Sequence, residues 1–235
     1  GQEFRSHYLV PMLAAIWSAA PGTVEQLPAR FILGFMHNHG LMQLRNRPQW
    51  RTIVGGSRRY VQALLAPISS CVRLQTPIAS VKRQNDGVVV QAEGSSPERY
   101  DAVVFATHAD QSLALLEDIS PTEQQILSAL PYQANTAVLH SDESQMPANR
   151  RAWASWNYRI PGDDKTASSR ASVTYDLNRL QNLPTEKPVF VTLNPFEAID
   201  ARRVERTMTY HHPAYNLRSV AAQRRWSEIS VVQRT

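Results

Sequence analysis

The side chains of this sequence that most readily do chemistry are its seven histidines. His37 and His39 have the spacing of a metal pair, but no cluster of Asp, Glu or Cys accompanies them, which favours histidines at a helix end or in the core. His140, His211 and His212 would serve a hydrolase only beside a nucleophile, and the G-x-S-x-G turn that presents one is absent. The sequence therefore leaves the catalytic residues unknown and predicts no metal site.

Aromatic residues form a second candidate group, on segments that are expected to be strands. The group consists of Trp153, Trp156, Tyr158 and Tyr175. Because alternate residues of a strand share a face, Trp156 and Tyr158 should point together and Trp153 should point the other way. Such a group either fills an aromatic core or lines a cavity for an apolar substrate, and both interpretations stay open.

Composition excludes several classes of protein. The 235 residues are 43% apolar, as in a globular chain with one or two domains. The net charge of +5 is mild, and the basic residues do not interleave with aromatic ones, which argues against nucleic-acid binding. Cys71 is the single cysteine, so an internal disulfide is excluded and a reducing, cytoplasmic location is expected. Residues 9–17, the longest apolar stretch, are too few for a transmembrane segment.

Periodicity predicts the elements that must position these side chains. Apolar residues at helical spacing predict helices over residues 4–17, 29–38, 57–67, 110–116, 122–130 and 217–226. Alternating or β-branched runs predict strands over residues 50–54, 71–74, 79–81, 88–91, 100–106, 133–141, 152–158, 171–175, 189–193 and 202–210. The strands after residue 133 have short polar connections, including a loop at 162–169. They therefore predict an antiparallel sheet, packed on one face by the N-terminal helices.

The segment from residue 71 to residue 109 has the clearest local signals. Asn85-Asp86-Gly87 is a strong hairpin signal. The apolar run at 100–106 suits a strand buried on both faces, as in a parallel sheet. It ends at Thr107, directly before a helix, and such strand ends are where α/β sheets hold ligands. Upstream, Gly55-Gly56 permits a tight turn into the next helix, which Ser57 can cap.

This order of elements resembles the middle of the flavin-containing amine oxidase superfamily, which includes monoamine oxidases, phytoene desaturases and protoporphyrinogen oxidases. The resemblance lies in Gly55-Gly56-Ser57 before a helix, then Pro77-Ile78, then a strand ending at Ala106-Thr107. The stretch from Tyr100 to His108, with residues 153–158, is also similar to a bacterial group of NAD/FAD-binding oxidoreductases. The likeness extends over almost the whole chain.

The resemblance implies an FAD cofactor, because ordinary side chains cannot oxidise amines or unactivated C–H bonds. Ile78 would contact the adenine through its backbone, and Ala106 and Thr107 would pack beside the pyrophosphate or ribose. The implied cofactor-binding set is Gly55, Gly56, Pro77, Ile78, Ala106 and Thr107, and the aromatic group would line the substrate cavity. Taken singly, Pro77-Ile78 also reads as a kinked edge strand and Ala106-Thr107 as a helix start.

The implied fold class is α+β (mixed α/β). It combines an antiparallel substrate-domain sheet and its flanking helices with part of an FAD-binding domain, namely a β-meander and one parallel strand. The expected segments are a helical part of the substrate domain (1–49), a partial FAD-binding domain (50–120), the antiparallel-sheet part of the substrate domain (121–211) and a C-terminal helix (212–235).

The absence of two glycine-rich motifs bears on the function. The nine glycines include no G-x-G, whereas a flavin dinucleotide is ordinarily held by G-x-G-x-x-G. The family's C-terminal glycine-rich flavin segment is also missing. We therefore expect an internal fragment of an FAD-dependent, amine-oxidase-like enzyme that oxidises an apolar or amine small molecule, inactive and without FAD when separated from its N- and C-terminal portions. The alternative is a non-catalytic module that binds an apolar ligand or partner and lacks the cofactor site.

Overall fold

The computed structural model describes residues 1–43, 45–46, 48–159 and 172–235. Contacts divide these residues into two compact units, one of residues 1–61 and 133–214, the other of residues 62–132 and 215–235. The loop predicted at 162–169 lies outside the described residues. Within the described ranges, no helix has the length and apolar character needed to cross a lipid bilayer.

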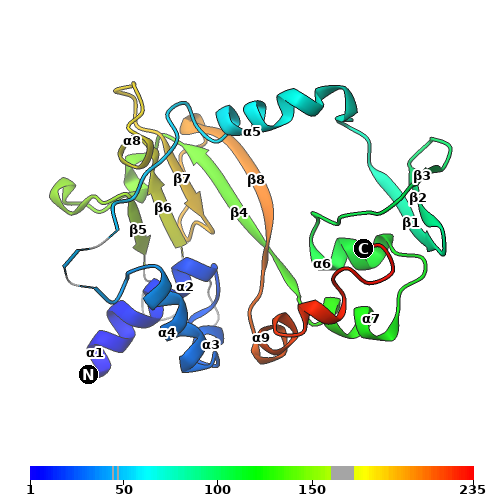
Figure 1. The fold of residues 1–235 in the computed structure, drawn as a ribbon. Helices are drawn as coiled ribbons and strands as arrows, with labels where there is room; N and C mark the ends of the chain where they lie inside the picture. Colours follow the sequence, from blue (N-terminus) through cyan, green and yellow to red (C-terminus); the bar gives the residue numbers. More distant parts are fainter. Residues whose placement is uncertain (44, 47, 160–171) are drawn as a thin grey trace. The chain divides into compact units, whose positions relative to one another are not determined.

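The first unit is built on an antiparallel sheet, as the sequence predicts (Figure 1). Among the described residues its strand order is β5-β6-β7-β4-β8. The strands are β4 (Tyr132–His140), β5 (Trp156–Arg159), β6 (Ser172–Asp176), β7 (Phe190–Leu193) and β8 (Val204–Pro213). Strand β5 begins later than predicted, because the Asn149 side chain accepts the N–H of Arg151 and caps a short 3-10 turn, Arg150–Ala152. The short helix α8 (Leu177–Gln181) follows β6 directly.

Helices at the N-terminus complete the first unit, close to their predicted positions. They are α1 (Gln2–Phe4), the π-helix Arg5–Leu9, α2 (Val10–Trp17), α3 (Pro21–Val24) and α4 (Ala29–Asn38). Their shared core is formed by buried Leu13, Ala14, Ala19 and Val24, with Ile32 and Met36 of α4 among the partly buried neighbours. The apolar spacing read from the sequence therefore packs these helices on one another.

A hydrogen bond near Pro11 connects these helices to the sheet. Pro11 has no N–H, so it cannot donate to the carbonyl of His7 one helical turn earlier. That carbonyl instead accepts the hydroxyl hydrogen of Tyr158 on β5, at 2.8 Å. The π-helix immediately before Pro11 is where the regular bonding pattern changes.

The second unit contains the predicted hairpin and helices. Its elements are β1 (Ile78–Gln84), β2 (Gly87–Ala92), β3 (Glu98–Tyr100), α6 (Ala109–Leu115), α7 (Pro121–Leu127), α9 (Leu217–Gln223) and the 3-10 turn Trp226–Glu228. The helix α5 (Arg58–Leu65) and the 3-10 turn Ala66–Cys71 precede them. Strands β1, β2 and β3 form the expected meander (Figure 1).

The glycine of the hairpin signal has a different role from the one expected. Gln84 pairs with Gly87, so the turn consists of Asn85 and Asp86, and neither has a positive φ. A Cβ on Gly87 would lie 2.8 Å from the carbonyl oxygen of Tyr100. Glycine is therefore required at this position for the close approach of β3 rather than for a left-handed turn.

Three predicted strands do not form. Residues 50–54 and 72–74 are irregular, and residues 101–106 are extended chain in which Val103 N–H donates to the Arg234 carbonyl at 3.0 Å. A short apolar run becomes a buried strand only between partner strands, which the described residues do not supply here. As a result Val54 and Val104 remain 95% and 89% exposed.

A buried ion cluster joins β1 to the helical part of the second unit. The Arg83 guanidinium donates to both carboxylate oxygens of Glu123, at 2.5 and 2.9 Å, and to Asp118 Oδ2 at 2.9 Å. Glu123 also accepts from Ser120 in the capping box that starts α7. Its hydrogen bonds to Arg83, chiefly, hold the pKa of the Glu123 carboxyl at about 2. Arg83 is thereby bound to Asp118 and Glu123, which lie 35 and 40 positions further along the chain.

Candidate functional site

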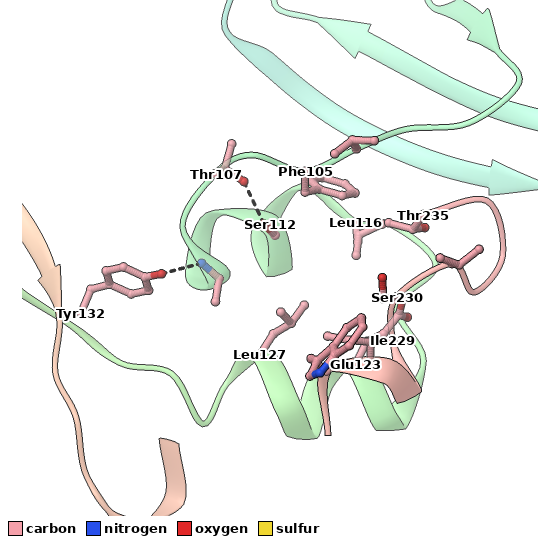
Figure 2. A pocket seen from close by; sticks show the side chains of 14 residues that line it. Phe105, Thr107, Ser112, Leu116, Glu123, Leu127, Tyr132, Ile229, Ser230 and Thr235 are labelled. Carbon is pink, nitrogen blue, oxygen red and sulfur yellow. Dashed lines mark hydrogen bonds between the residues drawn. The ribbon is translucent and has the colours of Figure 1, made fainter. Parts of the chain in front are cut away.

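A cavity of about 540 Å³ lies within the second unit, and we call it the α6–α7 pocket (Figure 2). Its lining comes from the extended segment before α6, from α6 and α7, and from the segment after α9. The lining residues are Val104, Phe105, Thr107, Ala109, Ser112, Leu116, Glu123, Leu127, Tyr132, Trp226, Ile229, Ser230, Val231 and Thr235. Thr107, one of the residues expected at the cofactor, is therefore a pocket residue.

Tyr132 shapes one side of this pocket. Its hydroxyl oxygen accepts the N–H of Ala109 at 3.1 Å (Figure 2). Its ring stacks on His108, with 4.2 Å between ring centres. Sequence reasoning missed Tyr132, because its place at the start of β4 gives no sign that it caps α6. The pocket also holds a hydroxyl pair, Thr107 and Ser112, 2.8 Å apart.

The start of α6 has few free donors to offer an anion. The N–H of His108 donates to Gln111 Oε1, that of Ala109 to Tyr132, and that of Gln111 to Asp110 Oδ1. Lysine, arginine and histidine are all absent from the described residues of the lining. A pyrophosphate needs free N–H groups or basic side chains, so this pocket does not suit it.

The edge of the meander offers a different kind of site, at Ile78. Pro77 C=O accepts the N–H of Glu93 at 2.9 Å, and Ile78 pairs with Ala92. In an antiparallel ladder this pattern makes Ile78 and Ala92 a non-hydrogen-bonded pair, so the N–H and C=O of Ile78 point away from β2. Strand β1 is the outer strand of the meander and Ile78 is 37% exposed. A donor and an acceptor thus lie side by side at an open edge.

The remaining expected cofactor contacts are distributed over both units. Gly55 and Gly56 have φ values of 83° and 80°, which glycine adopts without strain, and they precede α5. These glycines belong to the first unit, whereas Pro77, Ile78, Ala106 and Thr107 belong to the second. Ile78 and Ala106 are not among the residues that line the α6–α7 pocket.

The aromatic group divides between the two faces of the sheet. Trp156 and Tyr175 are cross-strand partners and meet edge-on, with ring centres 5.4 Å apart. Trp153 instead packs edge-on against Phe190, at 5.9 Å, and its Nε1–H donates to the Pro147 carbonyl at 2.8 Å. Phe190 pairs with Asp176, one residue along from Tyr175, so Trp153 lies on the opposite face. Burial raises the pKa of the Tyr175 hydroxyl.

Among the histidines, His140 has the most defined environment. Its Nδ1 accepts the N–H of Asp142 at 3.0 Å, so the proton lies on Nε2, which donates to Thr192 Oγ1 at 2.7 Å. Thr192 is in turn 2.8 Å from the Thr174 hydroxyl. Burial lowers the pKa of the His140 imidazole. This network links β4, β6 and β7 through side chains that are buried.

The other candidate histidines do not form a metal site. His39 lies at the end of α4, stacked on Phe35 with 4.0 Å between ring centres, and His37 is exposed. His212 Nδ1 is 3.2 Å from the Ser18 hydroxyl, and His211 is exposed. Across the described residues no group of three potential metal ligands is found.

The buried His140 predicts a pH dependence for the first unit. The folded unit holds His140 neutral and the unfolded chain protonates it, so its stabilising contribution is complete above pH 6.5, the ordinary pKa, and decreases as the pH falls below it. Urea unfolding at pH 7.5 and pH 5.5 should show this loss. His140→Gln should reduce it and His211→Gln should not, whereas equal pH dependence in both variants would contradict the assignment.

Comparisons with known proteins agree with this fold. The sequence profile of the family described as flavin containing amine oxidoreductase matches residues 9–192. No curated protein sequence matches. A CLA-producing fatty acid isomerase from P. acnes has a similar structure, with a TM-score of 0.61 and 13% identity over 96% of this chain and 56% of that one. Cyclohexylamine oxidase from Brevibacterium oxydans IH-35A has a TM-score of 0.56 and 12% identity over 93% and 55%.

At such low identity the two structures establish a common fold and nothing about substrate. This chain spans a little over half the length of each of them. The mixed α/β class, with antiparallel sheets and flanking helices, is confirmed.

Proposed function

Because the chain belongs to the flavin-containing amine oxidoreductase family, we propose that it supplies part of an FAD-dependent enzyme that oxidises a small apolar or amine substrate. The observation that carries the proposal is the family match over residues 9–192. The shared fold over 96% of the chain supports it. In such an enzyme the flavin, when bound, accepts the hydride, and the protein binds, orients and excludes water.

The edge of β1 is the proposed adenine contact. The outward N–H and C=O of Ile78 can pair with the acceptor and donor on the rim of an adenine ring, and Pro77 keeps its own carbonyl occupied by Glu93. Gly55 and Gly56 are proposed to let the backbone approach the cofactor closely, since glycine carries no side chain. Ala106 and Thr107 are proposed as packing contacts only, because the amides beside them are already engaged.

The substrate wall is proposed to lie on the face that carries Trp156, Tyr158 and Tyr175. Trp156 is 49% exposed and so remains accessible to a ligand. Trp153, the fourth member of the aromatic group, packs on Phe190 on the opposite face of the sheet. We assign residues 1–49 and 121–211 to substrate binding, 50–120 to a partial FAD-binding domain and 212–235 to a C-terminal helix. A reducing, cytoplasmic location fits the single, exposed Cys71.

The test is FAD binding by the complete gene product. We expect flavin absorbance at about 450 nm and a rise in thermal stability with added FAD. Ile78→Pro removes one N–H at an edge where proline is tolerated, and should weaken FAD binding about tenfold. Ile78→Val keeps the backbone groups and serves as the control. A complete protein with neither the absorbance nor the stabilisation would refute the proposal.

The second candidate is a non-catalytic module that binds an apolar ligand or partner. The observation in its favour is the apolar α6–α7 pocket, in which the one carboxylate, Glu123, is already held by Arg83 and Ser120. Absence of flavin from the complete protein, together with binding of apolar ligands, would favour this candidate.

A further inference from the structure

We propose that the α6–α7 pocket binds an uncharged, largely apolar small molecule that carries a hydrogen-bond acceptor, at a site apart from the proposed adenine contact at Ile78. The proposal concerns the second unit alone and does not rest on the proposed oxidoreductase function. Its basis is the size of the pocket, the absence of free charge in its lining and the hydroxyl groups that face it.

The size and walls of the pocket suit a small organic ligand. A volume of about 540 Å³ falls within the range of about 300–1,000 Å³ that is usual for ligand sites. Most of the lining is apolar, including Phe105, Leu116, Leu127, Trp226 and Ile229. Figure 2 shows side chains from α6, α7 and the C-terminal segment converging on this space.

Charge excludes the common ionic ligands. Among the described residues that line the pocket, Glu123 is the only acidic one and none is basic. Both Glu123 oxygens accept from Arg83, and one also accepts from Ser120. An anionic ligand would find no cation, and a cationic ligand would find no free carboxylate. An uncharged ligand loses the least solvation free energy on transfer from water into this lining.

The hydroxyl groups define the polar end of the ligand. Ser112 donates to the His108 carbonyl at 3.0 Å, so Thr107 must donate to Ser112 across their 2.8 Å contact. Tyr132 accepts from Ala109, and its own hydrogen has no acceptor among the described residues. The Ser230 hydroxyl likewise has no partner among those residues. Two free donors at an apolar wall select a ketone, ether or similar acceptor.

The proposed ligand site differs from the proposed adenine contact in chemistry as well as in place. Ile78 offers a backbone donor and acceptor at a strand edge, and it is absent from the pocket lining. The pocket offers side-chain hydroxyls and apolar walls. Thr107 lines the pocket and also belongs to the proposed cofactor contacts, so the two sites meet at this residue.

The probe is Prodan, a neutral naphthalene ketone whose emission shifts to the blue in an apolar site. We expect saturable binding with a blue shift. Leu127→Arg places a charge in the pocket and should weaken binding at least about tenfold. Leu74→Arg adds the same charge in the same unit at a residue that is 81% exposed and outside the lining, and should leave binding unchanged.

Two further variants separate loss of binding from loss of folding and test the role of the ketone. Leu127→Trp fills the pocket without a charge and should also weaken Prodan binding, with circular dichroism checking that both Leu127 variants fold. Ser230→Ala should weaken Prodan about threefold but leave 2-dimethylaminonaphthalene, which has no ketone, unaffected. Absence of saturable binding, or equal binding by the Leu127 and Leu74 variants, would overturn the proposal. Flavin-free protein that still binds Prodan refutes only the oxidoreductase proposal.

Discussion

Replacing Arg83 by methionine is expected to destabilise the second unit by about 3–5 kcal/mol, because it leaves the buried carboxylate of Glu123 and the partly buried carboxylate of Asp118 without their cation. The Arg83 and Glu123 side chains are 2% and 4% exposed, so water cannot take over the lost hydrogen bonds. Hydrogen exchange measured on peptides from β1 and β2 would report the loss. Peptides from β6 and β7, in the first unit, provide an internal reference.

The matched control is Arg73→Met. Arg73 also pairs with a glutamate through two hydrogen bonds, but the Arg73 and Glu98 side chains are 57% and 41% exposed. Exposed pairs contribute little, so no measurable change in exchange is expected. Acid provides a second check. The Glu123 pKa is lowered from 4.5 to about 2, so its contribution is complete above pH 4.5 and is lost as the pH falls toward 2. Equal effects of the two arginine variants would contradict burial as the cause.

Phe190→Ala is expected to destabilise the first unit by about 3–5 kcal/mol, the usual cost of removing a large buried ring. Phe190 is 1% exposed and contacts the rings of His140 and Trp153, at centre distances of 5.7 and 5.9 Å. Exchange in peptides from β6 and β7 measures the effect. Trp156→Ala, which truncates a half-exposed ring on the opposite face, should cost much less.

The comparison also tests the role of the aromatic group. If Trp156 formed core rather than a ligand wall, its removal would destabilise the sheet as much as removal of Phe190. A small stability loss with weakened substrate binding would instead support the proposed wall.

Local signals in the sequence predicted local structure well. Apolar spacing predicted a helix over residues 122–130, and α7 forms there, with a capping box of Ser120 and Glu123 at its start. Asn85-Asp86-Gly87 predicted the hairpin between β1 and β2. Such features depend on residues within a few positions of one another, so their types and spacing contain the necessary information.

The strand predicted over residues 100–106 does not form, because it depends on residues that are distant in the sequence. Its apolar, β-branched composition is suitable, but strand formation depends on partners that the described residues do not provide. Arg83 and Tyr132 were missed in the same way. Arg83 meets Glu123 from 40 positions away, and Tyr132 reaches Ala109 from 23. No pattern within either segment indicates the contact. Gly55-Gly56 and Pro77-Ile78 were picked out from residue type and order, and their role at a cofactor stays a prediction.

The bond between Tyr158 and the carbonyl left open by Pro11 affects the dynamics of the proposed substrate wall. A tyrosine has two side-chain torsions, and a hydroxyl bonded at 2.8 Å to the π-helix restricts both. The rotamer entropy of Tyr158 is therefore lost when the chain folds and not when a ligand arrives. Because Pro11 in α2 has no N–H, the His7 carbonyl can hold the Tyr158 ring of β5 in place before any ligand binds.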